Sequence, residues 1–279
     1  MQQLEGRVAV VTGGGSGIGA ALARVCGAAG MRVALADVEA DAVEGVAASM
    51  RDVGMQALSA VVDVRRREDL ERLAERTYAE FGACDLLCNN AGVMLNRPLL
   101  ETSAEDWEWT LSVNLWGVIH GLGVFLPRMK EQRREGHVVN VASIAGITNI
   151  GALGLGAYST SKAAVVMLSE FLRTELETGG IPIGVSVVCP GAVATRIAES
   201  ERNRPEGLGS GPTAAQTAAD PNSAQVPGTQ TPIEVAEAIL EGVRENHAFI
   251  LTHPEMKGGA EARSRRLLGA FDEAAAKSS

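Results

Sequence analysis

The feature that most constrains this chain is the alternation of two kinds of segment, from the N-terminus to about residue 252. Short β-branched runs predict strands at 7–12, 32–37, 57–63, 85–89, 137–143, 183–189 and 248–252. Amphipathic or Ala-rich stretches between them predict helices at 18–29, 39–53, 67–81, 104–132, 158–178 and 233–246. Such alternation is typical of parallel strands joined by right-handed crossovers. We therefore predict an α/β fold of the Rossmann type. It would have a doubly wound, seven-stranded, mainly parallel sheet with helices on both faces, in a single domain spanning 1–279.

One segment interrupts this alternation. Residues 205–232 are rich in Pro, Gly, Ala and Gln and show no periodicity. A long irregular loop inside a compact domain usually has a function or is disordered. We predict a flexible lid over a substrate site within about 192–232, called the lid segment below; a solvated insertion without a role is the alternative. The last residues, 254–279, mix Ala with charge and are expected to form a helix or a frayed tail.

Charge and hydropathy exclude several kinds of partner. The 279 residues include 25 basic and 34 acidic ones, a formal net charge of −9. This argues against nucleic acid, whose binding depends on Lys and Arg contacts to phosphate. Two uncharged runs, 109–127 and 138–161, contain Gly and polar residues, so we expect buried elements rather than membrane spans. The N-terminus shows no signal-peptide pattern.

The cysteines and histidines show no metal-ligand spacing. Cys26, Cys84, Cys88 and Cys189 form no C-x-x-C pair, so neither a disulfide framework nor a zinc site is expected. Cys84 and Cys88 lie in an apolar run and are predicted to be small buried hydrophobes. We expect no metal and a reducing, cytoplasmic location.

A glycine-rich turn follows the first predicted strand. Gly13, Gly17 and Gly19 give the spelling T-G-x-x-x-G-x-G, with Ser16 and Ile18 inside the turn. Glycines let the backbone approach a pyrophosphate, and the next helix offers its free N–H groups to it. The position between a strand and a helix favours a dinucleotide site. A merely tight turn is the alternative.

Asp37 ends the second predicted strand, 18 residues after Gly19. An acidic residue about 20 residues beyond the glycines binds the ribose 2′-OH of NAD, and its charge would repel the 2′-phosphate of NADP. Neither Ser16 nor Val38 supplies a compensating cation. We therefore predict NAD as the cofactor. Asp63 and Val64 end the third predicted strand and are expected to lie against the adenine, although an ordinary strand-end Asp is the alternative.

Tyr158 and Lys162 stand four residues apart at the start of a predicted helix, in the sequence YSTSK. Residues at this spacing share a helix face. An unperturbed tyrosine titrates at about 10, too high for a base at neutral pH. A neighbouring ammonium and a positive nicotinamide ring would both favour the phenolate. The pair is therefore a candidate proton-transfer site.

These motifs together resemble the short-chain dehydrogenase/reductase family, in its ordinary single-domain form. The matching stretches run through about residues 1–200: TGGGSGIG (12–19), Asp37, Asp63, NNAG (89–92), Asn114, Ser143, YSTSK (158–162) and PGAVAT (190–195). The resemblance implies an oxidoreductase that moves a hydride between a substrate carbon and nicotinamide C4.

The resemblance also implies roles for individual residues. Tyr158 would be the general acid/base and Lys162 would lower its pKa and hold the nicotinamide ribose. Ser143 would hydrogen-bond the reacting oxygen, and Asn114 would hold a relay water. The other implied cofactor-binding residues are Asn90, Ala91, Gly92, Pro190, Gly191, Val193 and Thr195. Ordinary structural roles stay open for three residues: Asn114 as a hydrogen-bonding helix residue, Ser143 as a strand-end cap and Thr195 as a helix N-cap.

The substrate is less constrained. Met94, Leu95, Ile147, Leu153 and Leu155 are candidates for an apolar pocket wall. We expect a small hydrophobic secondary alcohol or ketone. A weaker similarity to bacterial Cα-dehydrogenases of lignin-derived aryl ethers suggests a benzylic or other bulky apolar alcohol. Ser143 and Tyr158 are 15 residues apart, slightly more than the family leads us to expect, which affects the substrate pocket rather than the chemistry.

Two further expectations come from the resemblance. Family members pair through two long helices, here about 104–132 and 158–178, and often form tetramers through the last strand and helix; a homodimer or homotetramer is therefore expected. The alternative function is a regulator that senses NAD without turnover. The presence of Asn114, Ser143, Tyr158 and Lys162 together argues against it, because a sensor does not need all four.

Overall fold

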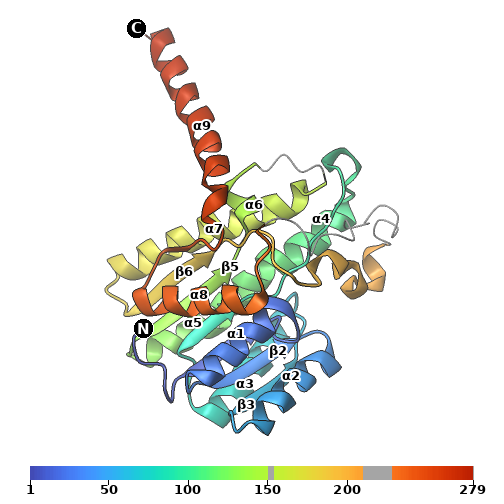
Figure 1. Cartoon of the computed structure of the whole chain (residues 1–279), viewed down its shortest axis with the longest axis vertical. Helices are drawn as coiled ribbons and strands as arrows, with labels where there is room; N and C mark the ends of the chain where they lie inside the picture. The colour runs from blue at the N-terminus through green and yellow to red at the C-terminus, as the bar shows by residue number, and fades with distance from the viewer. Residues whose placement is uncertain (150–153, 210–227, 279) are drawn as a thin grey trace.

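Seven parallel strands form the centre of the protein. The computed structural model describes residues 1–149, 154–209 and 228–278 (Figure 1). The strand order is β3-β2-β1-β4-β5-β6-β7, and every pair of neighbours is parallel. The strands are β1 (Val8–Thr12), β2 (Arg32–Asp37), β3 (Ala57–Val61), β4 (Leu86–Asn89), β5 (Gly136–Val141), β6 (Ile183–Val188) and β7 (Phe249–Ile250). The predicted Rossmann-type α/β fold is confirmed.

Helices cover both faces of the sheet because the strands bury side chains on both. In β1, Ala9 and Val11 belong to one core cluster, whereas Val8 and Val10 belong to the other, as the two-residue period of a strand requires. The first cluster includes side chains of α1 (Gly17–Ala28), α2 (Ala40–Asp52) and α8 (Pro232–Glu245). The second includes side chains of α3 (Arg67–Phe81), α5 (Gly117–Glu131) and α7 (Gly156–Thr178).

The strand order creates a crevice at the carboxyl ends of the strands. From β1 the chain crosses to β2 on one side, whereas β4 pairs with the other side of β1. In open parallel sheets, ligands bind at such a reversal of strand order. The turn after β1 and the turn after β4 therefore open into the same crevice.

The predicted helix at 104–132 is interrupted. It consists of α4 (Ala104–Leu111), a π-helical turn over Ser112–Trp116 and α5. By length and composition alone, Ala104–Glu131 could cross a membrane. Here α5 packs against α3 and β4, so this segment is a layer of the fold, as expected for 109–127. Single π turns inside α-helices are frequent at functional sites.

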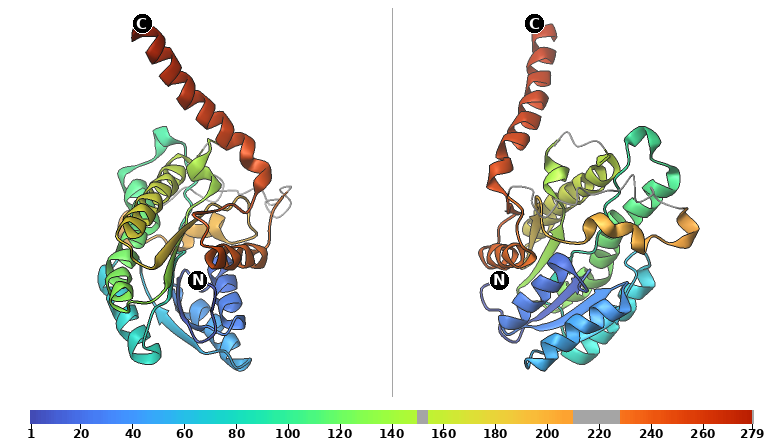
Figure 2. Two further views of the ribbon diagram at one scale, coloured as in Figure 1. Left: turned by 90° about the vertical axis from the view of Figure 1, so that its left-hand side faces the viewer. Right: turned by 45° about the vertical axis from the view of Figure 1, so that its right-hand side comes forward.

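The C-terminal residues form a helix rather than a frayed tail. A short 3-10 turn (Pro254–Met256) leads into α9 (Lys257–Ser278). This helix projects away from the sheet (Figure 2) and leaves Leu267, Leu268 and Phe271 exposed.

The four cysteines are buried and free, as predicted for Cys84 and Cys88. Within the described residues no cluster of His, Cys, Asp and Glu could hold a metal ion. Three predicted strands are too long: β3 ends at Val61, β5 at Val141 and β7 at Ile250. The residues after β3 and β5 leave the sheet to line the crevice.

Candidate active site

One open cleft brings most of the predicted site residues together. Its volume, counted with its open mouth, is about 1290 Å³. Among the residues proposed from the sequence, its lining includes Gly13, Ser16, Gly17, Ile18, Asp37, Asp63, Val64, Asn90, Ala91, Gly92, Ser143, Tyr158, Lys162, Pro190, Gly191, Val193 and Thr195. Gly19 and Asn114 stand behind the wall.

The glycine turn after β1 is built for close backbone approach. Gly13 and Gly17 have φ of +66° and +52°, which side-chain-bearing residues rarely adopt. A Cβ on Gly19 would stand 2.0 Å from the Gly13 carbonyl oxygen, so Gly19 allows α1 to pack on the turn. Ser16, the N-cap of α1, makes no side-chain capping bond, and the first turn carries no acid. The helix N-terminus therefore suits the pyrophosphate of a dinucleotide.

Thr12 joins this turn to the turn after β4. Its Oγ1 accepts hydrogen bonds from the backbone N–H groups of Asn90 (3.0 Å) and Ala91 (3.1 Å). In return, Asn90 Nδ2 donates to the Thr12 carbonyl at 2.9 Å. The side chain of Asn90 is thus used to hold the cleft floor together, and Thr12 is a positioning residue that the sequence analysis did not single out.

Two acidic side chains that the sequence predicted for the site, Asp37 and Asp63, line the cleft. Asp37 accepts from Gly15 N at 2.9 Å through one oxygen and from Glu39 N at 3.1 Å through the other. Asp63 is paired with Arg65, whose Nε lies 2.9 Å from Asp63 Oδ1. The carboxylate of Asp63 is therefore neutralised by its neighbour, whereas within the described part of the chain Asp37 accepts from backbone N–H groups only.

Tyr158 and Lys162 lie on the first turns of α7 and are almost completely buried. Lys162 Nζ donates to the Val141 carbonyl at 2.8 Å, and burial lowers the pKa of Lys162 to about 8. Burial raises the pKa of Tyr158, and the hydrogen bond with Ser143 partly offsets this. In the chain by itself the Tyr158 pKa is therefore raised, the opposite of the lowering expected for a site that also holds a positive ring.

Ser143 has two local partners at the end of β5. As N-cap of α6 (Ile144–Ile147), its Oγ accepts from Ala145 N at 3.2 Å. Its hydroxyl also donates a long 3.5 Å bond to the Pro190 carbonyl. The capping role left open from the sequence is present, and the same hydroxyl lies beside Tyr158 and faces the cleft.

Asn114 occupies the π turn between α4 and α5 and is fully buried. Its Oδ1 accepts from Val93 N at 2.8 Å, and its Nδ2 donates to the Val93 carbonyl and to Ser161 Oγ, both at 2.9 Å. A Cβ on Gly92 would lie 3.3 Å from Asn114 Oδ1 and 3.2 Å from Lys162 Nζ. Asn114 is thus close to the ammonium, but its side chain is used to fix the strand-end segment at Val93.

The first residues of the lid segment pack against the glycine turn. Its ends are joined by a parallel bridge between Val193 and Gln230. The ring of His253 contacts Gly191 N and the Ala192 carbonyl, each at 3.0 Å. A Cβ on Gly17 would lie 3.0 Å from Thr195 Cγ2, so Thr195 lies against the N-terminus of α1. Residues 210–227 of the predicted lid lie outside the described residues.

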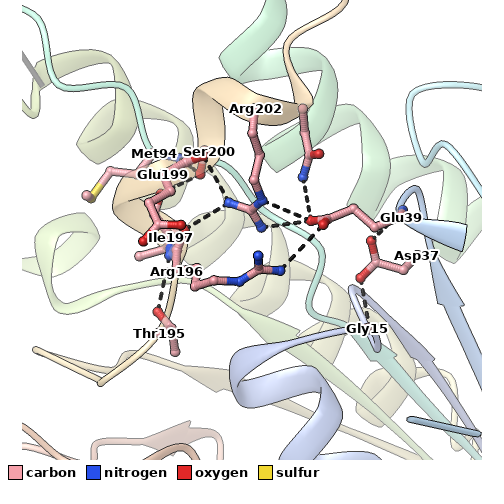
Figure 3. A network of polar contacts seen from close by, with 11 residues as sticks. Gly15, Asp37, Glu39, Met94, Thr195, Arg196, Ile197, Glu199, Ser200 and Arg202 are labelled. Carbon is pink, nitrogen blue, oxygen red and sulfur yellow. Dashed lines mark hydrogen bonds and ion pairs between the residues drawn. The ribbon is translucent and has the colours of Figure 1, made fainter. Parts of the chain in front are cut away.

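A 3-10 segment of the lid, η3 (Ile197–Asn203), crosses the cleft. Ser200 Oγ accepts from Met94 N at 3.1 Å, next to the lining residue Val93. Arg202 reaches Glu39 on the opposite wall (Figure 3). Next to this segment, buried Arg204 pairs with Asp106 at 2.5 Å and lies over the Trp109 ring. Residues 197–204 of the lid segment are therefore held by contacts with Met94, Glu39 and Asp106.

Comparison with known proteins agrees with this geometry. A sequence model of the short chain dehydrogenase family matches residues 7–206. The chain belongs to the short-chain dehydrogenase family.

Its similarity to individual family members extends over nearly the whole chain. A Cα-dehydrogenase of Sphingobium sp. (strain NBRC 103272 / SYK-6) is 38% identical over 271 residues, covering 96% of this chain and 87% of that protein. A short-chain dehydrogenase/reductase from Burkholderia phymatum, solved in complex with NAD, is 38% identical with a TM-score of 0.90, covering 96% of each chain. The apo form of LigD from Sphingobium sp. strain SYK-6 is 34% identical with a TM-score of 0.78, covering 95% of this chain and 97% of that one. The predicted resemblance is confirmed.

Most residues of the family motifs line the cleft as expected, whereas the described residues predicted for its apolar wall do not. Val93, Trp109, Val113 and Ile197 form the apolar wall, and none was predicted. Leu95 is fully buried behind Val93 and Trp109. Of the other predicted wall residues, Met94, Ile147 and Leu155 are not in the cleft lining of the described chain, and Leu153 lies outside the described residues. For the four described residues the prediction of the wall was wrong, because hydropathy does not distinguish a side chain that lines a cleft from one that lies a layer deeper.

Other residues of the site were also missed. Glu39, Arg196 and Arg202 line the cleft, and His253 fixes the turn at Gly191. Their sequence separations are large, so no local pattern could have shown these contacts. Only Thr12, at the head of the glycine motif, carried a usable signal.

Proposed function

We propose that this short-chain dehydrogenase interconverts a hydrophobic secondary alcohol and its ketone with NAD as cofactor. The observation that carries the proposal is the placement of Tyr158, Lys162 and Ser143 in the same cleft as the uncapped N-terminus of α1. A dinucleotide held by its pyrophosphate at Gly13–Gly17 would extend toward these three side chains.

In this proposal the cofactor carries the hydride and the protein's side chains carry the proton. Bound NAD supplies the hydride acceptor or donor. In alcohol oxidation the hydroxyl proton passes to the Tyr158 oxygen; in ketone reduction the same phenol returns it. Ser143 shares its hydroxyl between weak partners, and its long bond to Pro190 is easily exchanged for one to the substrate oxygen.

The protonation state of Tyr158 in the folded chain favours ketone reduction over alcohol oxidation. Burial raises the pKa of Tyr158, so the phenol is protonated at neutral pH and ready to act as an acid. Oxidation requires the phenolate. We propose that the Lys162 ammonium stabilises it, since Nζ lies 5.9 Å from the Tyr158 ring centre and is itself buried.

The proton exchanged between the Tyr158–Lys162 pair and solvent would pass by the π turn at Ser112–Trp116. The Asn114 side chain is occupied by Val93 and Ser161, so we propose that a relay water is held by the backbone of Ser112–Trp116 rather than by the Asn114 amide. The side chain then acts as a positioning group.

The apolar wall of the cleft supports the proposed substrate class. Val93, Trp109, Val113 and Ile197 are uncharged and mostly apolar, which suits a bulky apolar alcohol. The similarity to a Cα-dehydrogenase supports a benzylic alcohol as the first candidate.

Self-association is part of the proposal. Trp116 ends the π turn just before α5, and Met167 and Phe171 lie on α7; all three are more than half exposed, at 52%, 55% and 63%. Large exposed apolar side chains suit an interface between copies. We propose a homodimer or homotetramer acting in the cytoplasm as a single domain, with the lid segment over the substrate.

The test is a mixture of purified protein, NAD and a panel of benzylic and aliphatic secondary alcohols, followed by NADH absorbance. We expect turnover with apolar alcohols and little with phosphorylated sugars. Tight NAD binding without turnover of any alcohol or of the matching ketones with NADH would instead favour the sensor.

A further inference from the structure

A single carboxylate gathers the polar groups of the lid segment at the adenosine end of the cleft. Glu39 accepts from Arg202 Nε at 3.1 Å and Nη2 at 2.8 Å, from Asn203 Nδ2 at 3.0 Å and from Arg196 at 3.4 Å. Figure 3 shows both guanidinium groups turned toward Glu39, with Asp37 next to it. Glu39 therefore pairs with two arginines that arrive from more than 150 residues later in the sequence.

This cluster of charged side chains lies next to the residue expected to bind the adenosine ribose of the cofactor. Asp37, Glu39, Arg196 and Arg202 all line the cleft, and the Glu39 backbone N–H donates to Asp37 Oδ1 at 3.1 Å. Asp37 is the group that would hold the ribose hydroxyls. The two guanidinium groups thus lie close to the position where a 2′-phosphate would be.

Two arginines at this position conflict with a preference for NAD. Arginine binds phosphate through several directed donors, so a pair of unoccupied guanidiniums would favour NADP. The hydrogen bond from Asn203 and the two arginines lower the pKa of Glu39, which keeps it ionised at neutral pH. Its negative charge faces both guanidinium groups, and its carboxylate accepts from Nε and Nη2 of Arg202 and from Nη2 of Arg196. Arg202 Nη1 donates to the Arg196 and Glu199 carbonyls instead.

We propose that Glu39 determines cofactor specificity by pairing Arg196 and Arg202 and thereby withholding them from a 2′-phosphate. Glu39 is a positioning residue in this scheme, because it acts through the arginines rather than on the ribose. The inference rests on the proposed function, since it takes Asp37 as the ribose-binding group. It differs from that function in assigning the discrimination to a second carboxylate and to the lid segment.

A simple lid latch would make a different prediction. If Glu39 only held η3 across the cleft, its loss would weaken every adenosine ligand by the same factor. If it withholds the arginines, its loss would improve ligands that carry a 2′-phosphate relative to those that lack it. The ratio of two affinities therefore separates the two roles.

The experiment compares 5′-AMP with 2′,5′-ADP by calorimetry on the full chain, so that no hydride transfer is needed. In Glu39→Gln we expect the affinity ratio to shift toward 2′,5′-ADP by about tenfold, as removal of a nearby negative charge should produce. Adding Arg202→Gln and Arg196→Gln to this variant should return the ratio toward the wild-type value. Glu39→Ala tests the same change by truncation. Glu44→Gln, on the same helix but paired with Arg51 and Ser59, makes the same charge change and should leave the ratio unaltered.

The outcomes are distinguishable. An unchanged ratio in Glu39→Gln and Glu39→Ala, with 5′-AMP still bound, overturns the inference and leaves the proposed function standing. Equal weakening of both ligands also overturns it. A wild-type protein that binds neither 5′-AMP nor NAD removes the proposed function and this inference together.

Discussion

The ammonium nitrogen of Lys162 lies 5.9 Å from the centre of the Tyr158 ring, one helical turn earlier on α7. It is held there by a 2.8 Å bond to the Val141 carbonyl at the end of β5. The helix supplies the spacing, and the sheet supplies the anchor. Both groups of the proposed proton-transfer site therefore lie on α7, and Lys162 is in addition tied to the sheet, so each can be tested separately.

Tyr158→Phe removes the hydroxyl and leaves the ring. We expect turnover to fall to background, a loss of about a thousandfold or more, because no other described side chain in the cleft is placed beside Ser143 to take the proton. NAD binding should be retained, as measured by titration of NADH fluorescence. Substantial turnover in this variant would show that the assigned role is wrong.

Lys162→Met should stabilise the protein while it removes activity. Burial lowers the pKa of Lys162 from 10.5 to about 8. Below pH 8 the folded protein therefore holds a buried ammonium at Lys162, which destabilises the fold. The cost is on the order of 3 kcal/mol, partly offset by the lost hydrogen bond to Val141, worth about 1 kcal/mol. We expect a gain of about 2 kcal/mol for the variant at pH 7.

The sign of its pH dependence follows from linkage. Between pH 8 and 10.5 the unfolded wild-type chain binds more protons at this site, so wild-type stability rises with pH. The advantage of Lys162→Met should therefore shrink across this range in urea unfolding experiments. Exposed Lys130→Met is the control. An advantage that is independent of pH would contradict the buried charge as its cause.

Asp37→Ala should relax the preference for NAD. Among the residues that the structure describes, Asp37 accepts only from the backbone N–H groups of Gly15 and Glu39, so no cation offsets its repulsion of a 2′-phosphate. We expect the ratio of kcat/KM for NAD over NADP to fall by about tenfold or more. Because Asp37 also holds the Gly15 turn, Asp37→Asn is the matched variant that keeps the shape. An unchanged ratio in both variants would contradict the role of Asp37 in selecting NAD over NADP.

Asp106→Asn should loosen the fixed end of the lid segment. Asp106 is 1% exposed and accepts from Arg97 at 2.7 Å, from Arg204 at 2.5 Å and from Ser103 N at 3.0 Å. Loss of its charge leaves Arg97 without its anion and leaves Arg204 paired with Glu201 alone, at a cost of about 3 kcal/mol. Urea unfolding measures this, and Glu108→Gln, exposed on the same helix, is the control. Because Arg204 lies over Trp109 in the cleft wall, the KM for the alcohol should rise as well.

Much of the fold could be predicted because its signals are local. A buried parallel strand is a short apolar run, and each run here is separated from the next by a helix-period pattern. The break at Ser112–Trp116 could not be predicted, since a π turn depends on what packs against the helix. The same limit explains the strand ends: Val62 follows β3 in an apolar run but already leaves the sheet to line the cleft.

The sequence by itself determined the order of strands and helices, the glycine turn and the Tyr158–Lys162 spacing, because each depends on neighbours within a few residues. Only the tertiary structure decided what surrounds them. It buries Tyr158 and so raises its pKa, it uses the Asn114 amide to hold Val93, and it brings Arg196 and Arg202 to Glu39. Burial and charge pairing between distant segments exist only after the chain has folded, and the acidity of Tyr158 and the proposed cofactor selectivity depend on them.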